Sequence, residues 1–263
     1  MIRIAAVADL HFAEDSAGKY RRHLDGIEER ADVLLIAGDL TRVGDPAEAK
    51  ALAGDLAGLP VPAVAVLGNH DYHSDREEDV VGAMENAGVR VLEGSSVVLP
   101  VGERRLGIAG IKGFGGGFLG ASGSDFGEPE MKAFIATTRA AADALERELG
   151  SLEADVRVAL IHYAPVPETL AGERLEIYPF LGSYLLAEAI DRAGADLVVH
   201  GHAHAGSEQG VTPGGVPVRN VAMQVIASPY HLYCFGDEDD ACEGAPIPSR
   251  SGATRPFADT DAG

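Results

Sequence analysis

Three histidines follow a short apolar run late in the chain, and their types and spacing could bind a transition metal. Residues 197–199 are apolar and suggest a buried strand, and Gly201 lets the backbone turn where that strand ends. His202 and His204 are two residues apart, so in an extended segment they project to the same side. Neutral imidazoles in such a pair can chelate zinc, iron, copper or nickel. For this cluster alone, a solvated loop that is rich in histidine is the competing interpretation.

Four other apolar runs end in the same way, each passing directly to Asp, Asn or His. The junctions are Asp9-Leu10-His11 after 4–8, Gly38-Asp39 after 33–37, Gly68-Asn69-His70-Asp71 after 64–67, and His162 after 156–161. In open α/β sheets, ligands bind in the crevice outside the carboxyl ends of the strands. Taken singly, Asp39 could cap a helix and His162 could be a hydrogen-bonded core histidine. The five junctions together predict one convergent site.

The segments around these junctions predict an α/β protein, because helical and strand-like patterns alternate. Helical patterns cover 19–30, 45–57, 74–87, 131–149 and 183–193. Between 89 and 110 the pattern changes to short strands, at 97–101 and 105–109, which indicates antiparallel or mixed pairing. Late strands are expected at 216–222 and 224–235. Residues 236–263 are acidic and rich in Pro, Gly and Ser, which predicts a flexible tail after a domain of residues 1–235.

A glycine-rich segment, 113–127, lies between the third and fourth junctions and contains Phe114, Phe118 and Phe126. The favoured interpretation is a flexible surface loop. The alternative is a mobile lid whose aromatic rings stack on a substrate.

Composition describes an ordinary globular protein of 263 residues with 46% apolar residues. No apolar run approaches the roughly 20 residues that span a bilayer, and the chain enters a strand at once, without a signal-peptide pattern. We therefore expect a cytoplasmic protein that does not associate with membranes. Cys234 and Cys242 lie away from the metal-like motifs, and we expect ordinary thiols, with a local bridge as the alternative.

The charge balance restricts the partners. Acidic residues outnumber basic ones 41 to 21, for a formal net charge of -20. Such a surface repels polyanions, so extended nucleic acid is not expected to bind. Small phosphorylated substrates remain compatible, because bound metal can reverse the sign of the local field. A homo-oligomer is left open.

As a set, the five junctions resemble the five motif blocks of the calcineurin-like metallophosphoesterases. The resemblance runs from residue 9 to residue 204. It implies a four-layer sandwich in which two mixed β-sheets are flanked by helices, with a two-metal site at the sheet edge. The chain departs from the family pattern at Arg42, where an acidic residue is common. That position does not bind metal in the family, so the departure bears on local packing more than on activity.

The resemblance also implies a role for each residue of the site. Asp39 would bridge two metal ions, and the other ligands would be Asp9, His11 and His204 for the first ion, and Asn69, His162 and His202 for the second. His70 would stabilise the phosphoryl oxygens or protonate the leaving group, and Asp71 would orient its ring. A turn or helix-cap carboxylate is the competing interpretation of Asp71. The mixed nitrogen and oxygen donors suit manganese, iron or zinc.

Residues outside the motif blocks carry weaker expectations. His200 is expected in the core or behind the ligands, and His23 on the surface. His73 and His231 are not assigned to the site. Tyr163 is the best-placed substrate contact in the loop that follows His162.

The expected activity is hydrolysis of a small phosphodiester, such as a cyclic nucleotide, by a hydroxide that bridges the two metals. A phosphomonoesterase, nuclease or pyrophosphatase on the same site is the alternative, because the motif set specifies the chemistry and leaves the substrate open. A non-catalytic scaffold of the same fold is a further alternative, and it is disfavoured because every ligand and His70 are present.

Overall fold

The computed structural model describes residues 1–236 and 245–246. The predicted tail, 236–263, therefore lies outside the described residues except at 236 and 245–246. The short strand at Ala245–Pro246 pairs in parallel with Tyr233 and Cys234.

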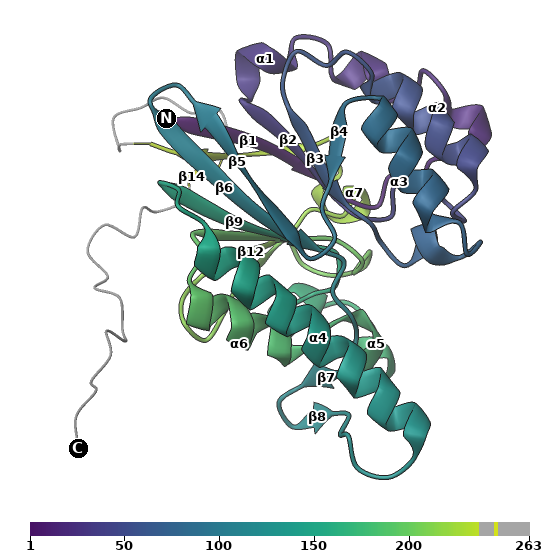
Figure 1. Ribbon diagram of the computed structural model, residues 1–263, viewed down its shortest axis with the longest axis vertical. Helices are drawn as coiled ribbons and strands as arrows, with labels where there is room; N and C mark the ends of the chain where they lie inside the picture. Colours follow the sequence, from purple (N-terminus) through teal and green to yellow (C-terminus); the bar gives the residue numbers. More distant parts are fainter. Residues whose placement is uncertain (237–244, 247–263) are drawn as a thin grey trace.

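Two six-stranded sheets form the centre of the molecule (Figure 1). In spatial order, the first contains β14 (Ala245–Pro246), β13 (His231–Phe235), β1 (Ile2–Val7), β2 (Val33–Ala37), β3 (Ala63–Val66) and β4 (Val89–Val91). The second contains β11 (Gln209–Val211), β12 (Pro217–Asn220), β10 (Leu197–His200), β9 (Val156–Ile161), β6 (Arg104–Ile111) and β5 (Ser95–Val101). The inner strands β1 to β3, and β6, β9, β10 and β12, run parallel, while β13, β11 and β5 pair antiparallel with their neighbours.

Helices cover the outer face of each sheet (Figure 1). On the first sheet lie α1 (Ile27–Arg30), α2 (Pro46–Leu56) and α3 (Glu77–Asn86), and on the second lie α4 (Pro129–Ser151) and α6 (Tyr184–Ala193). Strand β1 shows how alternation builds the layers. Its Ile4 and Ala6 pack between the two sheets, whereas Ala5 and Val7 pack toward the helices. The four-layer sandwich predicted from the motif resemblance is confirmed.

Two sequence-predicted elements differ in the structure. The helix expected at 19–30 is a 3-10 turn, Arg21–His23, followed by the single-turn α1, because Gly26 has a left-handed backbone (φ 72°). The strand expected at 224–235 begins only at His231. A short helix, α7 (Met223–Ile226), precedes it and ends at Ala227 with φ 48°.

The glycine-rich segment packs against the molecule over its first half, so the predicted flexible surface loop is wrong there. Its backbone forms the hairpin of β7 (Gly117–Phe118) and β8 (Ala121–Ser122) and bonds to Gly182. Phe118 is buried beside α5 (Tyr178–Leu181), and Phe114 is partly buried. Phe126, by contrast, is 87% exposed.

Two further sequence expectations concern the cysteines and the helices. Cys234 is disulfide-bonded rather than an ordinary thiol, and Cys242 lies outside the described residues. None of the described helices combines the length and the apolar character that a bilayer-spanning helix needs.

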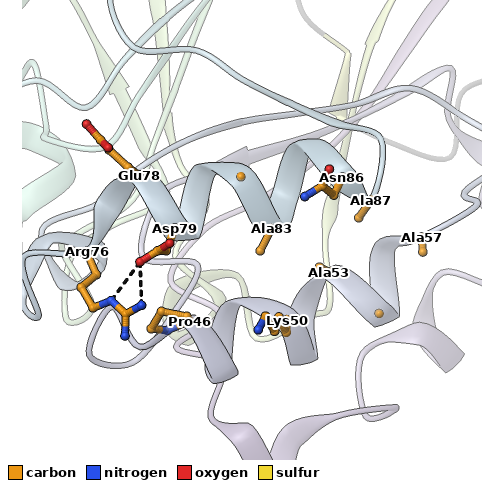
Figure 2. Close-up of a pocket in the computed structure, with 12 residues that line it drawn as sticks. Pro46, Lys50, Ala53, Ala57, Arg76, Glu78, Asp79, Ala83, Asn86 and Ala87 are labelled. Carbon is orange, nitrogen blue, oxygen red and sulfur yellow. Dashed lines mark hydrogen bonds and ion pairs between the residues drawn. The ribbon is translucent and has the colours of Figure 1, made fainter.

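A groove separates α2 and α3 on the outer surface (Figure 2). Small side chains such as Ala53 and Ala83 line it, and Arg76 and Asp79 form an ion pair at one end, with 2.8 Å between Nη2 and Oδ2. Its lining residues belong to neither of the acid–histidine clusters that could hold a metal.

Candidate metal centre

The five sequence junctions meet in space. Each follows one of the strands β1, β2, β3, β9 and β10, which run parallel within their own sheets. Parallel strands present their carboxyl ends at one sheet edge, so the loops that follow them are brought together. In the described part of the chain, two groups of acidic and histidine side chains are close enough to hold a metal ion. All of their members were predicted from the sequence.

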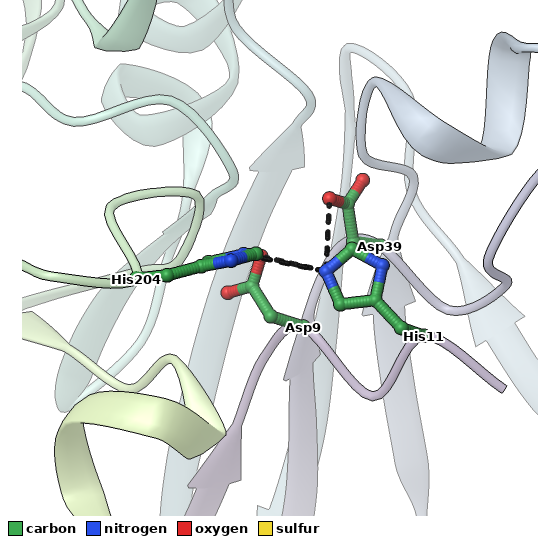
Figure 3. Close-up of side chains that lie close together, drawn as sticks. All are labelled: Asp9, His11, Asp39 and His204. Atoms are coloured by element: carbon green, nitrogen blue, oxygen red, sulfur yellow. Dashed lines mark hydrogen bonds and ion pairs between the residues drawn. The ribbon is translucent and has the colours of Figure 1, made fainter.

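The first cluster contains Asp9, His11, Asp39 and His204 (Figure 3). The Nε2 atoms of His11 and His204 lie 3.3 Å apart. His204 Nε2 is 2.9 Å from Asp9 Oδ1, and His11 Nε2 is 3.7 Å from Asp39 Oδ2. The hydrogen bond to Asp9 raises the pKa of His204. Two imidazole nitrogens that both face carboxylates form a donor set suited to one shared cation.

The second cluster contains Asp39, His162 and His202. His162 Nε2 lies 3.4 Å from Asp39 Oδ1 and 3.0 Å from Asn69 Oδ1. The His162 and His202 rings are 4.8 Å apart. Asn69 therefore presents its side-chain oxygen to the same group of atoms, as the sequence predicted.

Asp39 belongs to both clusters and supplies the fit test for metal ions. Its side chain is 1% exposed, and within the described part of the chain its buried Oδ2 accepts no hydrogen bond. Burial raises the pKa of Asp39, although a hydrogen bond from the His70 backbone opposes the shift. An unpartnered buried carboxylate oxygen is costly unless a cation compensates it. The donor set therefore fits divalent metal ions on both sides of Asp39.

Backbone carbonyl groups determine which ring nitrogen each histidine offers. His162 Nδ1 donates to Ala37 O (2.8 Å), which leaves Nε2 toward Asp39. His202 Nε2 donates to Phe180 O (3.1 Å), which leaves Nδ1 as its available nitrogen. Metal-binding histidines commonly donate the other N–H in this way, which orients the ring and fixes its tautomer.

The backbone is strained at four of these residues. Among the described residues, six other than glycine have positive φ, and four of them are Asp9 (60°), His11 (43°), Asp39 (49°) and His202 (72°). Each such conformation costs about 1–3 kcal/mol and persists only where the surrounding structure enforces it. Strain of this kind concentrates at functional sites.

Two motif glycines are required because the backbone comes very close to the carboxylates. A Cβ at Gly68 would lie 2.1 Å from Asp39 Oδ1, and one at Gly201 would lie 2.3 Å from Asp9 Oδ2. A Cβ at Gly68 would also lie 2.2 Å from the Asp39 backbone nitrogen, and one at Gly201 would lie 2.5 Å from Ala8 Cβ, so no side chain fits at either position unless the neighbouring loop moves. The glycines therefore allow neighbouring loops to approach Asp9 and Asp39.

Comparison with known proteins agrees with this geometry. Residues 2–206 match the family model described as calcineurin-like phosphoesterase. The chain belongs to the calcineurin-like phosphoesterase family. It is accordingly a metal-dependent phosphoester hydrolase by class. A search of curated protein sequences finds no match.

Solved structures share the fold at low sequence identity. Phosphopantetheinyl hydrolase from Mycobacterium tuberculosis is 17% identical, with a TM-score of 0.65 over 90% of this chain and 97% of that chain. The Thermus thermophilus protein TT1561 is 16% identical, with a TM-score of 0.53 over 83% and 88%. A putative 5′-nucleotidase from Staphylococcus aureus is 17% identical, with a TM-score of 0.52 over 83% of this chain and 48% of that chain.

His70 lies beside both clusters of this calcineurin-like phosphoesterase. Its ring meets that of His11 edge-on, with 4.5 Å between centroids, and its Nε2 is 3.9 Å from Asp39 Oδ2. Its Nδ1 donates to the carbonyl oxygen of Arg42 (2.7 Å). Position 42 therefore contributes its backbone, which explains why an arginine is compatible with the site where the family often has an acidic residue.

Asp71 does not orient the ring of His70, and the predicted contact is wrong. Its carboxylate is fully buried and accepts four hydrogen bonds. The donors are Leu40 N (3.1 Å), Thr41 N (2.8 Å), Thr41 Oγ1 (2.6 Å) and Gly68 N (2.8 Å). Burial raises the pKa of Asp71 to about 6 against the effect of these donors. Through these hydrogen bonds Asp71 joins the loop that carries Asp39 to the loop that carries Asn69.

Predicted positions outside the motif blocks lie in the core, on the surface and beside the second cluster. His200 is fully buried and contacts Thr169 Oγ1 (2.8 Å) and Gly201 O (2.8 Å), which confirms a core position behind the ligands. His23 is exposed, as predicted. Tyr163 is 7% exposed, and its ring lies 4.5 Å from that of His202. The carbonyl groups of Arg42 and Phe180 were not predicted, because sequence gives no signal for a backbone contact between distant loops.

Buried neutral histidines give a testable pH dependence. Burial lowers the pKa of His11 and of His162 to about 4, and that of His200 to about 3. The unfolded chain therefore takes up a proton at position 200 below about pH 6.5, while the folded chain does not. As the pH falls, the free energy of unfolding of wild type should therefore decrease relative to that of His200→Gln. The slope of this difference approaches about 1.4 kcal/mol per pH unit. Urea unfolding of both metal-free proteins between pH 8 and pH 5 measures the gap, and a gap independent of pH would contradict a neutral His200.

Proposed function

We propose that the protein is a two-metal phosphodiesterase that hydrolyses a small phosphodiester. The observation that carries the proposal is Asp39, which belongs to two donor clusters and keeps a buried oxygen without a protein partner in the described residues. Asp9, His11 and His204 would hold the first ion, and Asn69, His162 and His202 the second. When bound, the two cations supply Lewis-acid chemistry, polarising the phosphoryl oxygens and lowering the pKa of water.

Residue charges support a phosphate ester as the bound group. Among the proposed ligands only Asp9 and Asp39 carry negative charge, so a centre loaded with two divalent ions is net positive. The imidazoles of His11 and His162 stay neutral to about pH 4, which keeps them available as metal ligands. Manganese, iron and zinc are the metals that this mixture of donors favours. The net charge of -20 favours a small substrate over a polyanion.

His70 is the proposed acid for the leaving group. Because the Arg42 carbonyl can only accept a hydrogen bond, Nδ1 carries a proton and Nε2 is the atom that takes up or releases one at the site. Nε2 also lies on the Asp39 side of the ring. A positioned acid of this kind contributes roughly 10²–10⁴-fold to rate.

Substitution of His70 by alanine separates an enzyme from a scaffold. Turnover is expected to fall by roughly 10²–10⁴-fold, while the metal content stays that of wild type because His70 is not a proposed ligand. His73→Ala, an exposed histidine three residues later, is the matched control and should retain turnover. Wild-type turnover in His70→Ala would remove His70 from the mechanism.

A hydrolysis screen tests the substrate class. Protein reconstituted with manganese is assayed on bis-p-nitrophenyl phosphate, p-nitrophenyl phosphate and a set of cyclic nucleotides. We expect at least one diester to be turned over faster than the monoester. A monoester preference over every diester would replace the proposal with a phosphomonoesterase, the alternative activity for the same centre.

A further inference from the structure

Lys112 has surroundings unlike those of the other lysines. The chain has four, and Lys19, Lys50 and Lys132 are exposed, whereas Lys112 is half-buried. It follows β6 directly, and its carbonyl oxygen accepts hydrogen bonds from the backbone N–H groups of His162 (3.0 Å) and Tyr163 (3.1 Å). The lysine therefore lies beside a proposed metal ligand, on a neighbouring strand of the same sheet.

Three aromatic rings surround the Lys112 ammonium group. Its Nζ lies 4.5 Å from the ring centroid of Tyr72, 5.2 Å from that of Phe114 and 5.6 Å from that of Tyr163. Tyr72 is two residues after His70, and the Tyr163 ring contacts that of His202. We call Tyr72, Phe114 and Tyr163 the aromatic cage. The cage holds a cation next to the proposed metal centre.

The aromatic cage stabilises the positive charge but does not use the N–H groups. An ammonium group has three donors, and a ring face is a poor substitute for an oxygen acceptor. Across residues 1–236, no hydrogen bond or ion pair joins the Lys112 ammonium to another side chain or carbonyl group. The N–H donors of Lys112 are thus available to a ligand.

The charges that face Lys112 come from three carboxylates. Burial lowers the pKa of Lys112, and Glu93, Asp39 and Glu77 oppose this shift in that order. None of the three forms an ion pair with the ammonium group in the described structure. Asp39 is the proposed bridging ligand, so its charge would be shared with metal ions in the loaded protein. Glu93 remains, but its carboxylate accepts a hydrogen bond from the Lys112 backbone N–H and not from the ammonium group, so the ammonium donors are left to an anionic ligand.

We propose that Lys112 is a specificity-determining residue that binds a second anionic group of the substrate. The aromatic cage fixes the ammonium group beside the metal centre, where it can reach a carboxylate or phosphate attached to the scissile group. The preferred substrate is therefore a small phosphodiester that carries a further negative charge. This inference rests on the proposed phosphodiesterase function and names the substrate class of the same site.

Two diesters of matched shape test the role of Lys112. One is bis-p-nitrophenyl phosphate, and the other replaces one nitro group by the isosteric carboxylate, so both release p-nitrophenol. Wild type is expected to have a lower KM for the carboxylate diester. Lys112→Gln should raise that KM by about tenfold, with kcat changed by less than about twofold and the KM for bis-p-nitrophenyl phosphate nearly unchanged.

Controls separate binding from folding. Lys112→Arg keeps the positive charge and should retain most of the preference for the carboxylate diester. Lys132→Gln makes the same chemical change on the exposed surface of α4 and should leave both KM values at wild type. Thermal unfolding of each variant shows whether the fold is intact. If Lys112→Gln were too unstable to assay, Lys112→Met, which removes the charge and keeps an apolar stem among the three rings, would take its place with the same expected loss of preference.

The outcomes distinguish this inference from the proposed function. Equal changes in KM for the two diesters, or no change in either, would overturn the role of Lys112 and leave the phosphodiesterase standing. A wild type that shows no preference for the carboxylate diester would overturn it as well. A wild type that hydrolyses neither of these diesters nor any cyclic nucleotide of the screen would overturn the proposed function itself.

Discussion

Asp39→Asn should lose nearly all turnover and yet give a more stable metal-free protein. Removing the carboxylate charge that both donor clusters share is expected to lower kcat by at least a hundred- to a thousandfold, comparable to losing one essential electrostatic contact. Without metal, the same carboxylate is buried and its Oδ2 has no partner in the described structure. Replacing it by a neutral amide should raise the free energy of unfolding by about 1–3 kcal/mol.

A substitution that lowers the turnover of the metal-loaded protein and stabilises the metal-free protein is the result expected of a site that binds cations. Urea unfolding of the metal-free proteins and steady-state turnover of manganese-loaded ones measure the two effects. Asp143→Asn is the matched control, because this exposed aspartate on α4 undergoes the same chemical change. Asp143→Asn should leave turnover at the wild-type value and change the free energy of unfolding by no more than about 0.5 kcal/mol. A metal-free Asp39→Asn that is less stable than wild type would mean that Asp39 is a structural residue.

Asp71→Ala is expected to cause the largest loss of stability. Its carboxylate accepts hydrogen bonds from three backbone N–H groups and from the Thr41 hydroxyl, all buried. Without the acceptor these donors remain unpaired in the interior, at a cost of about 3–5 kcal/mol in unfolding free energy. Because Asp71 holds the loops that carry Asp39 and Asn69, metal affinity should also fall by about 10–100-fold.

Two further variants remove fewer of these hydrogen bonds and test whether the loss of stability is correspondingly smaller. Asp71→Asn keeps one oxygen acceptor and should lose less stability than Asp71→Ala. Thr41→Val removes the one side-chain donor and should cost about 1 kcal/mol. The midpoint of urea unfolding followed by circular dichroism measures all three. A loss below about 1 kcal/mol for Asp71→Ala would show that water or rearranged groups satisfy the loop donors.

Short-range patterns predicted the α/β class and the convergence of the five junctions, whereas the four-layer sandwich and the proposed ligand roles came from the motif resemblance. Apolar alternation in β1 places Ile4 on one face and Ala5 on the other, and the strand order brings the polar residues that end each strand to one edge. Asn69 and His162 come from strands of different sheets, yet each was predicted from its place directly after a buried run. The α/β fold class alone was therefore enough to predict that these residues meet at one edge.

The contacts that orient the site could not be predicted in the same way. Asp71 follows His70 in sequence, which suggested a contact between neighbours, but its carboxylate turns toward backbone N–H groups of a loop 30 residues earlier. His202 is oriented by the carbonyl group of Phe180, which carries no sequence signal. The packing of Phe118 under α5 likewise depends on tertiary contacts that a glycine-rich composition conceals.

The metal content of the manganese-reconstituted protein, together with an anomalous difference map of its crystals, shows whether Asp39 joins two metal ions. We expect two ions per chain and two anomalous peaks, one against Asp9, His11 and His204 and the other against Asn69, His162 and His202, with Asp39 touching both. A single ion per chain, or peaks that leave Asp39 without a metal contact, would contradict the proposed two-metal centre.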